Sequence, residues 1–529
     1  MRSLAQENAN GPSAKLCYRL FCRCGSDHLL PHGTGDFMSL GAYLIPLLTL
    51  LPLSGAVLVL LLPAQWTKLI RALACTITWI TLMISAVICL HYDTATPGFQ
   101  LITKIVWLPS LGIAYQTGVD GISCVLILLH AICSLTAVLV SGSVENRVKE
   151  YYVLLLFLIA SIFGVFTALD LFFLYVFYEM AVVPLYPMII VWGSKNKEYG
   201  AMKLTLYVTL GAVLALVGLL SIYHATGLKT FDLIEIQSFL AAHPLDQTFQ
   251  TWAALLLTVG FGVVASLWPL HSWSPIGYAA APTAVSMLHA GVLKKIGIYA
   301  IIRLVLGLLP FGASVWMPYV AILAVINVLY GAWAAMAQND LKFVIGFASV
   351  SHMGYALLGI SAMTPLAVSG VVFFMFAHGV MAALSFALIG FIYHQTHTRD
   401  ISDLGGLMKP LPFVGACFVM AALASSGLPG FANFVSEIII FFGSWQVRPW
   451  PTLFAIFGIV VTATYMLRLV KNVFFGPVNR KWNNLKDAAS FLERLPYGLL
   501  VLILLIFGCW PAWLLNLIRP SVALLPLLR

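Results

Sequence analysis

Charged side chains stand in the middle of long apolar runs of this sequence. Glu179 is nine residues into LFFLYVFYEMAVVPLYPMIIVWG, and Lys294 and Lys295 lie well inside a run that begins at about Pro282. A lysine at the centre of a bilayer costs about 2.5–3.5 kcal/mol, so ionisable residues there usually mark an ion or proton pathway. Snorkelling to the membrane surface is the alternative, but both lysines are more than three helical turns from Pro282. The pattern therefore favours a pathway.

Histidines and a second glutamate recur in the apolar runs that follow. The near-neutral pKa of histidine suits it to relaying protons. A lone histidine in an apolar helix more often only packs, but the eighth, tenth and eleventh runs each carry one, which favours a chain of carriers. Lys203, near the start of its run, could also snorkel, and the sequence leaves both interpretations open. The predicted proton carriers are Glu179, Lys203, His289, Lys294, Lys295, His352, His378 and Glu437.

The composition excludes a soluble globular protein. The 529 residues are 61% hydrophobic and 9% charged, and the mean hydropathy is +0.97. These values indicate a multi-span membrane protein, in which loop lysines and arginines explain the net charge of +9 without any nucleic acid. The nine cysteines have no metal-binding spacing, and we find no phosphate-binding loop, haem-attachment motif or iron–sulfur set. We expect no catalytic site, metal or bound cofactor in this chain.

The elements that must position the carriers are about fourteen spans, which predicts an all-α polytopic fold. Proline and glycine interrupt two of them, at Pro269 and Pro275 in the seventh span and at Gly427, Pro429 and Gly430 in the twelfth. Broken helices five spans apart indicate two inverted five-helix repeats with a site between them. The expected spans are 40–62, 68–90, 122–141, 151–169, 170–193, 200–224, 252–270, 282–306, 312–336, 341–361, 366–393, 412–443, 452–473 and 496–518.

Domain boundaries follow from these spans. Residues 1–37 are polar and are expected to be a disordered extension or a wrongly assigned start, with the apolar chain beginning after Met38. Lysine and arginine are concentrated in loops after odd-numbered spans, which places those loops in the cytoplasm. The expected location is a bacterial inner membrane. Asp120 and Asp170, at span starts, are explained by helix capping. The expected divisions are 1–37, 38–150 with three helices, 151–306 and 312–473 as the repeats, and 474–529.

The motifs resemble the antiporter-like membrane subunits of respiratory complex I, and among these the M-type family. The resemblance covers about residues 115–475. It rests on GVDGIS at 118–123, FYEMAVVPLYPMIIVWG at 177–193, WPLHSW at 268–273, APTAVSMLHAGVLKKIGIYAIIR at 281–303, AQNDLKFVIGFASVSHMGY at 337–355, FAHGV at 376–380, HTRDISDLGGL at 397–407 and GLPGFANFVSE at 427–437.

This resemblance implies proton translocation coupled to quinone reduction elsewhere in the complex. Glu179 then looks like the fifth-helix glutamate and Lys295 like the central carrier of the eighth helix. His352 and His378 look like members of the polar axis, and Glu437 like the exit group. NADH, flavin, iron–sulfur clusters and quinone are expected on other subunits, and L-type and N-type chains are expected as neighbours.

One departure from the family pattern concerns the seventh helix. The lysine usual there is replaced by Val264, so Glu179 lacks its expected partner, and Lys294 and His289 are candidates to compensate. Two other functions stay open, the first because antiporter chains share the lysine and glutamate pattern and the second because of Val264. The chain could belong to a multi-subunit cation/proton antiporter, or it could be a structural spacer of a membrane complex that moves no protons. The accompanying subunits would distinguish these possibilities.

Overall fold

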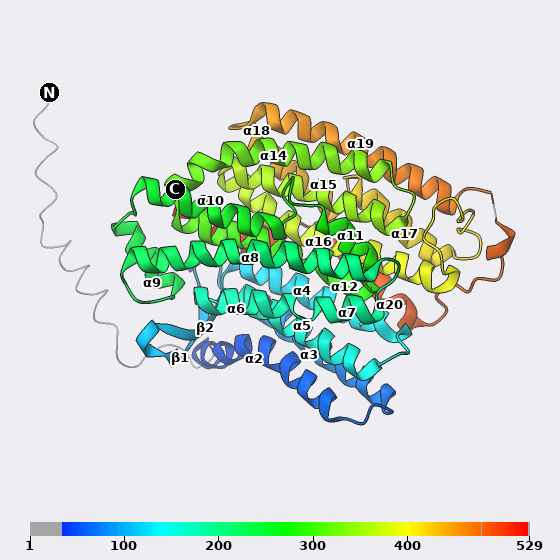
Figure 1. Cartoon of the computed structure of the whole chain (residues 1–529), viewed down its shortest axis with the longest axis horizontal. Helices are drawn as coiled ribbons and strands as arrows, with labels where there is room; N and C mark the ends of the chain where they lie inside the picture. The colour runs from blue at the N-terminus through cyan, green and yellow to red at the C-terminus, as the bar shows by residue number, and fades with distance from the viewer. Residues whose placement is uncertain (1–33, 478, 527–529) are drawn as a thin grey trace, which may run out of the picture. The chain divides into compact units, whose positions relative to one another are not determined.

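The computed structural model describes residues 34–477 and 479–526, and nearly all of this chain lies in apolar helices (Figure 1). Residues Ala42–Arg529 form one unit, and Met1–Gly41 form another, of which the description includes only the start of α2. The predicted extension at 1–37 lies almost entirely outside the described residues. Helix α2 itself begins at Thr34.

The helices follow the predicted spans closely, with short interruptions where the sequence carries proline or glycine. Their bounds are α2 Thr34–Leu61, α3 Thr67–His91, α4 Gly121–Val140, α5 Val148–Thr167, α6 Leu171–Val182, α7 Leu185–Trp192, α8 Lys197–Thr226, α9 Leu233–Ala242, α10 Gln247–Val264, α11 Trp273–Ala280, α12 Thr283–Leu288, α13 Lys294–Ala300, α14 Pro310–Met336, α15 Leu341–Ala362, α16 Pro365–Thr396, α17 Pro412–Ser425, α18 Ala432–Trp445, α19 Pro449–Phe474, α20 Phe491–Cys509 and α21 Ala512–Val522.

The number of membrane-crossing segments agrees with the prediction. Thirteen helical stretches in the described part of the chain are long and apolar enough to cross a membrane. Helices α17 and α18 add one interrupted apolar segment at the predicted twelfth span. The polytopic all-α fold is therefore confirmed. The predicted last span at 496–518 is wrong in its bounds, because Trp510 and Pro511 end α20 and α21 is a separate short helix.

Burial separates central helices from peripheral ones. The apolar windows of the stretch Thr283–Leu306 and of α16 are entirely buried within the protein, whereas those of α2, α3 and α8 are mostly exposed. The stretch Thr283–Leu306 carries Lys294 and Lys295, so lipid does not reach these lysines. Their snorkelling is thereby excluded.

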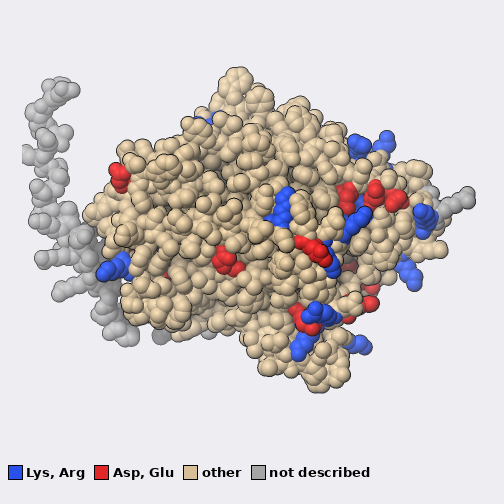
Figure 2. Space-filling view, in the orientation of Figure 1, with Lys and Arg blue, Asp and Glu red and all other residues tan. Residues whose placement is uncertain are grey.

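Charge is unevenly distributed on the surface. On the face seen in Figure 2, most Lys, Arg, Asp and Glu side chains gather toward the right end of the view, the end at which Figure 1 shows α17. The rest of that face is largely uncharged, as a lipid-facing belt requires. Which side of the membrane this end faces stays a prediction.

The seventh-span break begins earlier than predicted and differs at one proline. Helix α10 ends at Val264, and Pro269 lies in the irregular segment that follows. Pro275 does not break a helix, contrary to our expectation, because it lies in the first turn of α11. Backbone N–H groups there have no intrahelical partner, so proline is tolerated.

A buried asparagine satisfies the open backbone of this segment. The Asn327 side chain accepts a hydrogen bond from the Trp268 N–H, and its amide donates to the carbonyls of Ser266 (2.9 Å) and Val350 (3.1 Å). Irregular backbone at membrane depth is tolerated where other groups supply such partners. Asn327 on α14 thus ties the break to α15.

The twelfth-span break has the predicted residues. Gly427 and Gly430 have φ values of +66° and +100°, which residues other than glycine rarely adopt. Pro429 lies between them in the sequence. A Cβ atom on Gly427 would lie 2.7 Å from Glu437 Oε2. Glycine is therefore required both for the turn and for the approach of the carboxylate.

A short hairpin between α3 and α4 was not predicted. Strands β1 (Gln100–Leu108) and β2 (Ile113–Val119) pair antiparallel. The capping role of Asp170 is confirmed, because it accepts from the N–H groups of Phe172 and Phe173. Asp340 caps α15 in the same way. Isolated bridges join Asp170 to Asp232 and Asp340 to Asp400, a recurrence in keeping with two repeats, although the domain division stays a prediction.

Two basic residues counted as loop charges are in fact buried. Lys342 Nζ donates to the Ala281 carbonyl (2.6 Å), and Arg399 donates to the Ala279 carbonyl (2.6 Å) while pairing with Asp340 (3.1 Å). These carbonyls lie at the C-terminal end of α11, where helical acceptors are free. The two cations thus stabilise the restart after the seventh-span break.

Candidate functional site

Lys295 and His378 meet in the centre of the helix bundle. Lys295 lies on α13 and His378 on α16, both fully buried, and Lys295 Nζ is 2.8 Å from His378 Nδ1. Lys295 Nζ also donates a hydrogen bond to the Ala290 carbonyl. A lysine ammonium has only donors, so His378 Nδ1 is the acceptor and the neutral ring carries its proton on Nε2.

His352 on α15 continues the line of basic groups. Its ring centroid lies 5.2 Å from that of His378, and its Nε2 is 3.1 Å from the Ser425 carbonyl, at the end of α17. A carbonyl only accepts, so Nε2 carries the proton and Nδ1 is an open acceptor. Neither His378 Nε2 nor His352 Nδ1 has a partner in the described protein. A free donor and a free acceptor thus occur on adjacent rings.

Glu437 lies beyond His352, past the break in the twelfth span. Its side chain is buried on α18, and its Oε1 atom has no hydrogen-bond partner among the described residues. It lines an apolar cavity of about 520 Å³. Tyr355, one turn after His352, lies within electrostatic reach of Glu437. The arrangement places an unpaired carboxyl group at the far end of the row of basic residues.

Lys294 faces a different environment from its neighbour, as its position around the helix predicts. Its Nζ donates to Ser349 Oγ on α15 (3.2 Å) and lies 5.3 Å from the ring centroid of Tyr278 on α11. It is fully buried, so it faces the seventh-span segment and not lipid. Lys294 therefore stands beside the segment in which the family lysine is missing.

His289 lies closer to this group than an ideal α-helix would place it. A π-helical segment, η3, covers His289–Leu293. Since a π-helix pairs residues five apart, the offset of about 140° that an α-helix would give between His289 and Lys294 does not apply. The His289 ring packs against Trp273 (5.1 Å) and Tyr278 (5.3 Å), and its Nε2 atom has no partner within the described residues. A π-segment has no simple sequence signal, so this correction needed the structure.

His271 is a candidate that the sequence analysis missed. It lies in the irregular segment after α10, 5% exposed, and its ring is within electrostatic reach of both Lys294 and Lys203. Lys203 is half-buried on α8, with Nζ 5.7 Å and 5.8 Å from the ring centroids of Tyr199 and Tyr207. The WPLHSW motif contained the signal, because a histidine in irregular backbone at membrane depth faces protein or water.

Glu179 is not brought into contact with the lysines. It lies on α6, half-buried, and its Oε1 atom has no hydrogen-bond partner among the described residues. Tyr175, one turn earlier on α6, is the polar side chain beside its carboxyl group. Val264 is fully buried and supplies no charge. Glu179 thus lacks a cationic contact in this structure, as the sequence predicted.

A buried ion pair lies on the same lysine-bearing stretch. The Arg303 guanidinium donates to the Asp120 carboxylate and to Ser123 Oγ (3.3 Å). Asp120 also caps α4 by accepting from the Ser123 N–H (2.9 Å), so its predicted capping role is confirmed. The ion pair with Arg303 is a second role, which was not predicted. Both charges are satisfied, which makes the pair a structural element rather than a carrier.

The described residues contain no group of three or more His, Cys, Asp or Glu that could hold a metal ion. The buried charged and polar groups form a row of proton donors and acceptors instead. Such a row can pass protons between neighbours.

Comparisons with known proteins give the same result as the motifs. Residues 168–462 match the family model described as NADH:quinone oxidoreductase/Mrp antiporter, transmembrane. The chain is 35% identical to NADH-quinone oxidoreductase subunit M of Rhodobacter capsulatus, over 91% of this chain and 96% of that one. It is 33% identical to NAD(P)H-quinone oxidoreductase chain 4 of Gloeobacter violaceus, over 88% of each.

Solved structures show the same fold. A chain of respiratory complex I from Thermus thermophilus superposes with a TM-score of 0.84 and 29% identity, covering 92% of this chain and 100% of that one. A chain of the Mrp complex from Dietzia sp. gives a TM-score of 0.80 at 20% identity, covering 92% and 98%, which shows the fold alone. The resemblance to the M-type family is thus confirmed, and the chain belongs to the NADH:quinone oxidoreductase/Mrp antiporter transmembrane family.

Proposed function

We propose that this chain is a proton-translocating subunit of the membrane arm of a complex I-type NADH:quinone oxidoreductase, with a proton route through Lys295, His378 and His352 to Glu437. The observation that carries the proposal is the buried contact between Lys295 Nζ and His378 Nδ1, which His352 extends toward the twelfth-span break. Three basic groups on three different helices converge there without any acidic partner in contact.

The hydrogen-bond pattern gives the transfer a direction. Lys295 gives a proton to His378 Nδ1, and His378 releases its Nε2 proton toward His352 Nδ1. His352 then releases its own Nε2 proton on the side of the Ser425 carbonyl. Each ring ends in the opposite tautomer, so the rings must return to their first tautomer before another proton passes. The proton count is conserved at every step, and Glu437 receives the released proton.

The first half of the route runs through Lys203, His271 and Lys294. The His271 ring interacts electrostatically with Lys203 and Lys294. Lys294 lies beside the broken seventh span. We infer that Lys294 takes the place of the lysine that the family carries where this chain has Val264. His289 packs against the rings of Trp273 and Tyr278 and is the nearest alternative proton carrier. Glu179 stabilises positive charge in this half through water.

The chain is a multi-pass membrane protein whose relatives belong to multi-subunit complexes. We propose L-type and N-type chains as its neighbours and a bacterial inner membrane as its location. NADH, flavin, iron–sulfur clusters and quinone would be bound by other subunits. The row of carriers described above moves protons and leaves electron transfer to those subunits.

A cation/proton antiporter subunit is the second candidate, favoured by the shared fold of the Mrp chain. Affinity purification of the tagged chain from its native membrane separates the two. Co-purifying iron–sulfur and quinone-site subunits support the complex I assignment, and co-purifying small antiporter subunits overturn it. Normal proton pumping by a complex with Lys295→Met would instead identify a structural spacer.

A further inference from the structure

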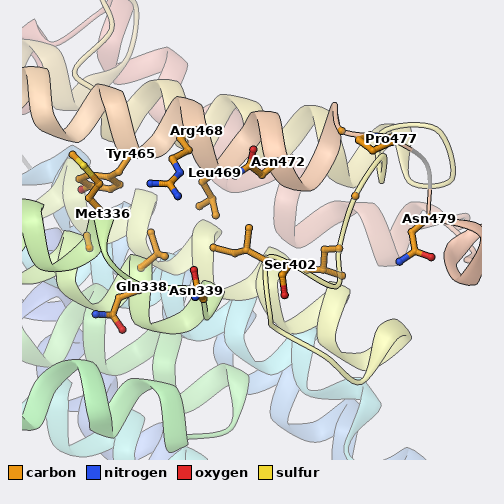
Figure 3. A pocket seen from close by; sticks show the side chains of 16 residues that line it. Met336, Gln338, Asn339, Ser402, Tyr465, Arg468, Leu469, Asn472, Pro477 and Asn479 are labelled. Atoms are coloured by element: carbon orange, nitrogen blue, oxygen red, sulfur yellow. The ribbon is translucent and has the colours of Figure 1, made fainter.

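A polar cavity of about 560 Å³ lies at the bundle surface, and its described lining includes none of the proposed proton carriers (Figure 3). It is formed where α14 ends, α15 begins and the last turns of α19 pass. Arg468 and Asn472 line it from α19, and Asn339 lines it from the segment between α14 and α15. Arg468 and Asn472 are four residues apart and so share one face of the helix. Figure 3 shows the Arg468 guanidinium directed into the cavity.

The charge of this cavity is unbalanced. Among the described residues that line it, Arg468 is the charged one, and no aspartate or glutamate faces it. Arg468 makes no ion pair or hydrogen bond with another described residue, in contrast to Arg303 and Arg399. A guanidinium with adjacent amide donors matches the geometry of a phosphate or carboxylate group. The cavity is therefore complementary to an anion.

An apolar wall adjoins the polar one. Met336, Val344 and Leu469 line the same cavity. On the outer faces of the two helices, Trp333 of α14 is 56% exposed and Leu467 of α19 is 54% exposed. An inorganic anion gains no binding energy from apolar surfaces, whereas the acyl chains of a lipid pack against them. The site thus has the two-part character of an amphiphile-binding site.

A buried hydroxyl marks the inner end. Tyr465 is 3% exposed, lines the cavity and has no hydrogen-bond partner for its hydroxyl among the described residues. Buried tyrosine hydroxyls normally find a partner. A headgroup oxygen reaching this end would supply one, which is an observation independent of Arg468.

We propose that this cavity binds the phosphate headgroup of an anionic membrane lipid, with Arg468 and the amides of Asn472 and Asn339 on the phosphate and the acyl chains along α14 and α19. The volume falls within the ~300–1,000 Å³ range of small-molecule sites. The lipid occupies a position outside the Lys295 relay, so the site does not depend on the proposed proton route.

The test uses the complete complex in nanodiscs that contain a photoreactive phosphatidylglycerol. After illumination, peptides of this chain are analysed by mass spectrometry for lipid adducts. We expect adducts on peptides that contain residues 333–344 and 465–477. Arg468→Gln should lower their yield by about tenfold, the effect of one charge-assisted contact, and Arg468→Lys should retain part of it. Lys471→Gln is the matched control, because Lys471 is exposed on the same helix and does not line the cavity.

Each alternative occupant gives its own result. Suppression of the adducts by inorganic phosphate would show a soluble-anion site and overturn the lipid assignment. Equal labelling by photoreactive phosphatidylcholine, or labelling unaffected by Arg468→Gln, would show only apolar contact and overturn it as well. Absence of adducts, with a neighbouring subunit's acidic residue cross-linked to Arg468, would identify a protein contact. Should Arg468→Gln fail to assemble, Asn472→Leu tests the same headgroup contact and must also lower the yield.

Discussion

Lys295 Nζ lies 2.8 Å from His378 Nδ1, across the interface of α13 and α16, and both side chains are fully buried. Two basic groups at this distance share one proton more readily than they hold two, because like charges repel each other. Neither group has an acidic partner in contact within the described residues. The pair is therefore suited to receive and release a single proton, and it is the natural place to test the route.

We expect Lys295→Met to stop proton pumping. The substitution preserves most of the side-chain volume but removes the proton that His378 accepts. Loss of a proton-transfer group commonly lowers the rate by about 10²-fold or more, so pumping should fall below one tenth of normal. The measurement is the rate of vesicle acidification per NADH oxidised, in reconstituted complexes. Lys471→Met, at an exposed position of α19, is the control, and normal pumping by Lys295→Met would refute the assignment.

His352→Gln should distinguish a role of His352 in proton transfer from a purely structural role. Glutamine can still donate a hydrogen bond to the Ser425 carbonyl, but it cannot pass a proton from one side to the other. We expect complexes that assemble normally and pump at below about a tenth of the wild-type rate.

His130→Gln is the matched control for this variant. His130 is also fully buried and also bonds a backbone carbonyl, that of Ile159 (2.9 Å), but it is not part of the carrier row. Equal losses in His130→Gln and His352→Gln would attribute both to packing and would remove His352 from the route.

Lys294→Met should also reduce pumping, if Lys294 replaces the absent lysine of the seventh span. Adding Val264→Lys to this variant should restore part of the activity, because it returns a cation to the first half of the route. Val264 is fully buried, so the larger lysine side chain should overpack its site and destabilise the fold by about 1–3 kcal/mol. The recovery of activity should therefore be partial. Proton pumping and complex yield are measured together. A double variant that assembles but pumps no better than Lys294→Met would contradict the replacement.

The sequence predicted the buried ionisable residues better than the backbone that arranges them. Lys295, His378 and His352 were identified because ionisable residues are costly in apolar spans, and that cost depends only on composition and position. Their contact, however, depends on how α13, α15 and α16 pack. No pattern within one span specifies the neighbouring span, so these contacts, and the tautomers that follow from them, required the structure.

Local irregularities account for the remaining differences. The π-segment at His289 changes which residues face each other, and it arises from packing rather than from a distinct composition. Pro275 looked like a helix breaker, but its effect depends on its position within α11. His271 escaped notice because its two lysine neighbours lie on other helices. The β1–β2 hairpin was not predicted because it lies between the long apolar segments that form α3 and α4.

The contact between the hairpin and α9 should weaken at high pH. Lys104 Nζ lies 2.7 Å from Asp232 Oδ2 and 3.3 Å from Glu235 Oε1. The hydrogen bond to Asp232 is the main cause that raises the pKa of Lys104 above its usual 10.5. A raised pKa means that the stabilisation is complete below pH 10.5 and is lost as the pH rises through the folded-state value.

Hydrogen exchange of the hairpin amides, corrected for the intrinsic rate at each pH, measures this loss. The Lys104 side chain is 40% exposed, so solvent screening limits the contribution to about 0.2–1 kcal/mol. Lys104→Gln should show the weaker protection at every pH. Protection in the wild-type protein that increases above pH 10.5 would contradict the sign.

Asp120→Asn should destabilise the protein more than a lost cap alone would. The amide can still accept from the Ser123 N–H, so the cap of α4 is retained while Arg303 becomes a buried charge without a counterion. Breaking one side of a buried pair costs about 3–5 kcal/mol. The midpoint of thermal unfolding of the purified complex should fall accordingly.

Two variants identify the unpaired charge as the cause. Asp170→Asn changes another buried capping carboxylate, one that accepts only backbone N–H groups. The asparagine amide nitrogen cannot accept from the Ala114 N–H, so the cost should be about 1–3 kcal/mol, without a stranded charge. Adding Arg303→Met to Asp120→Asn removes the stranded charge, and stability should return to near that of the wild type, since apolar replacements of buried pairs are often neutral. If the double variant were as unstable as the sum of both single changes, the buried ion pair would not be the source of the loss.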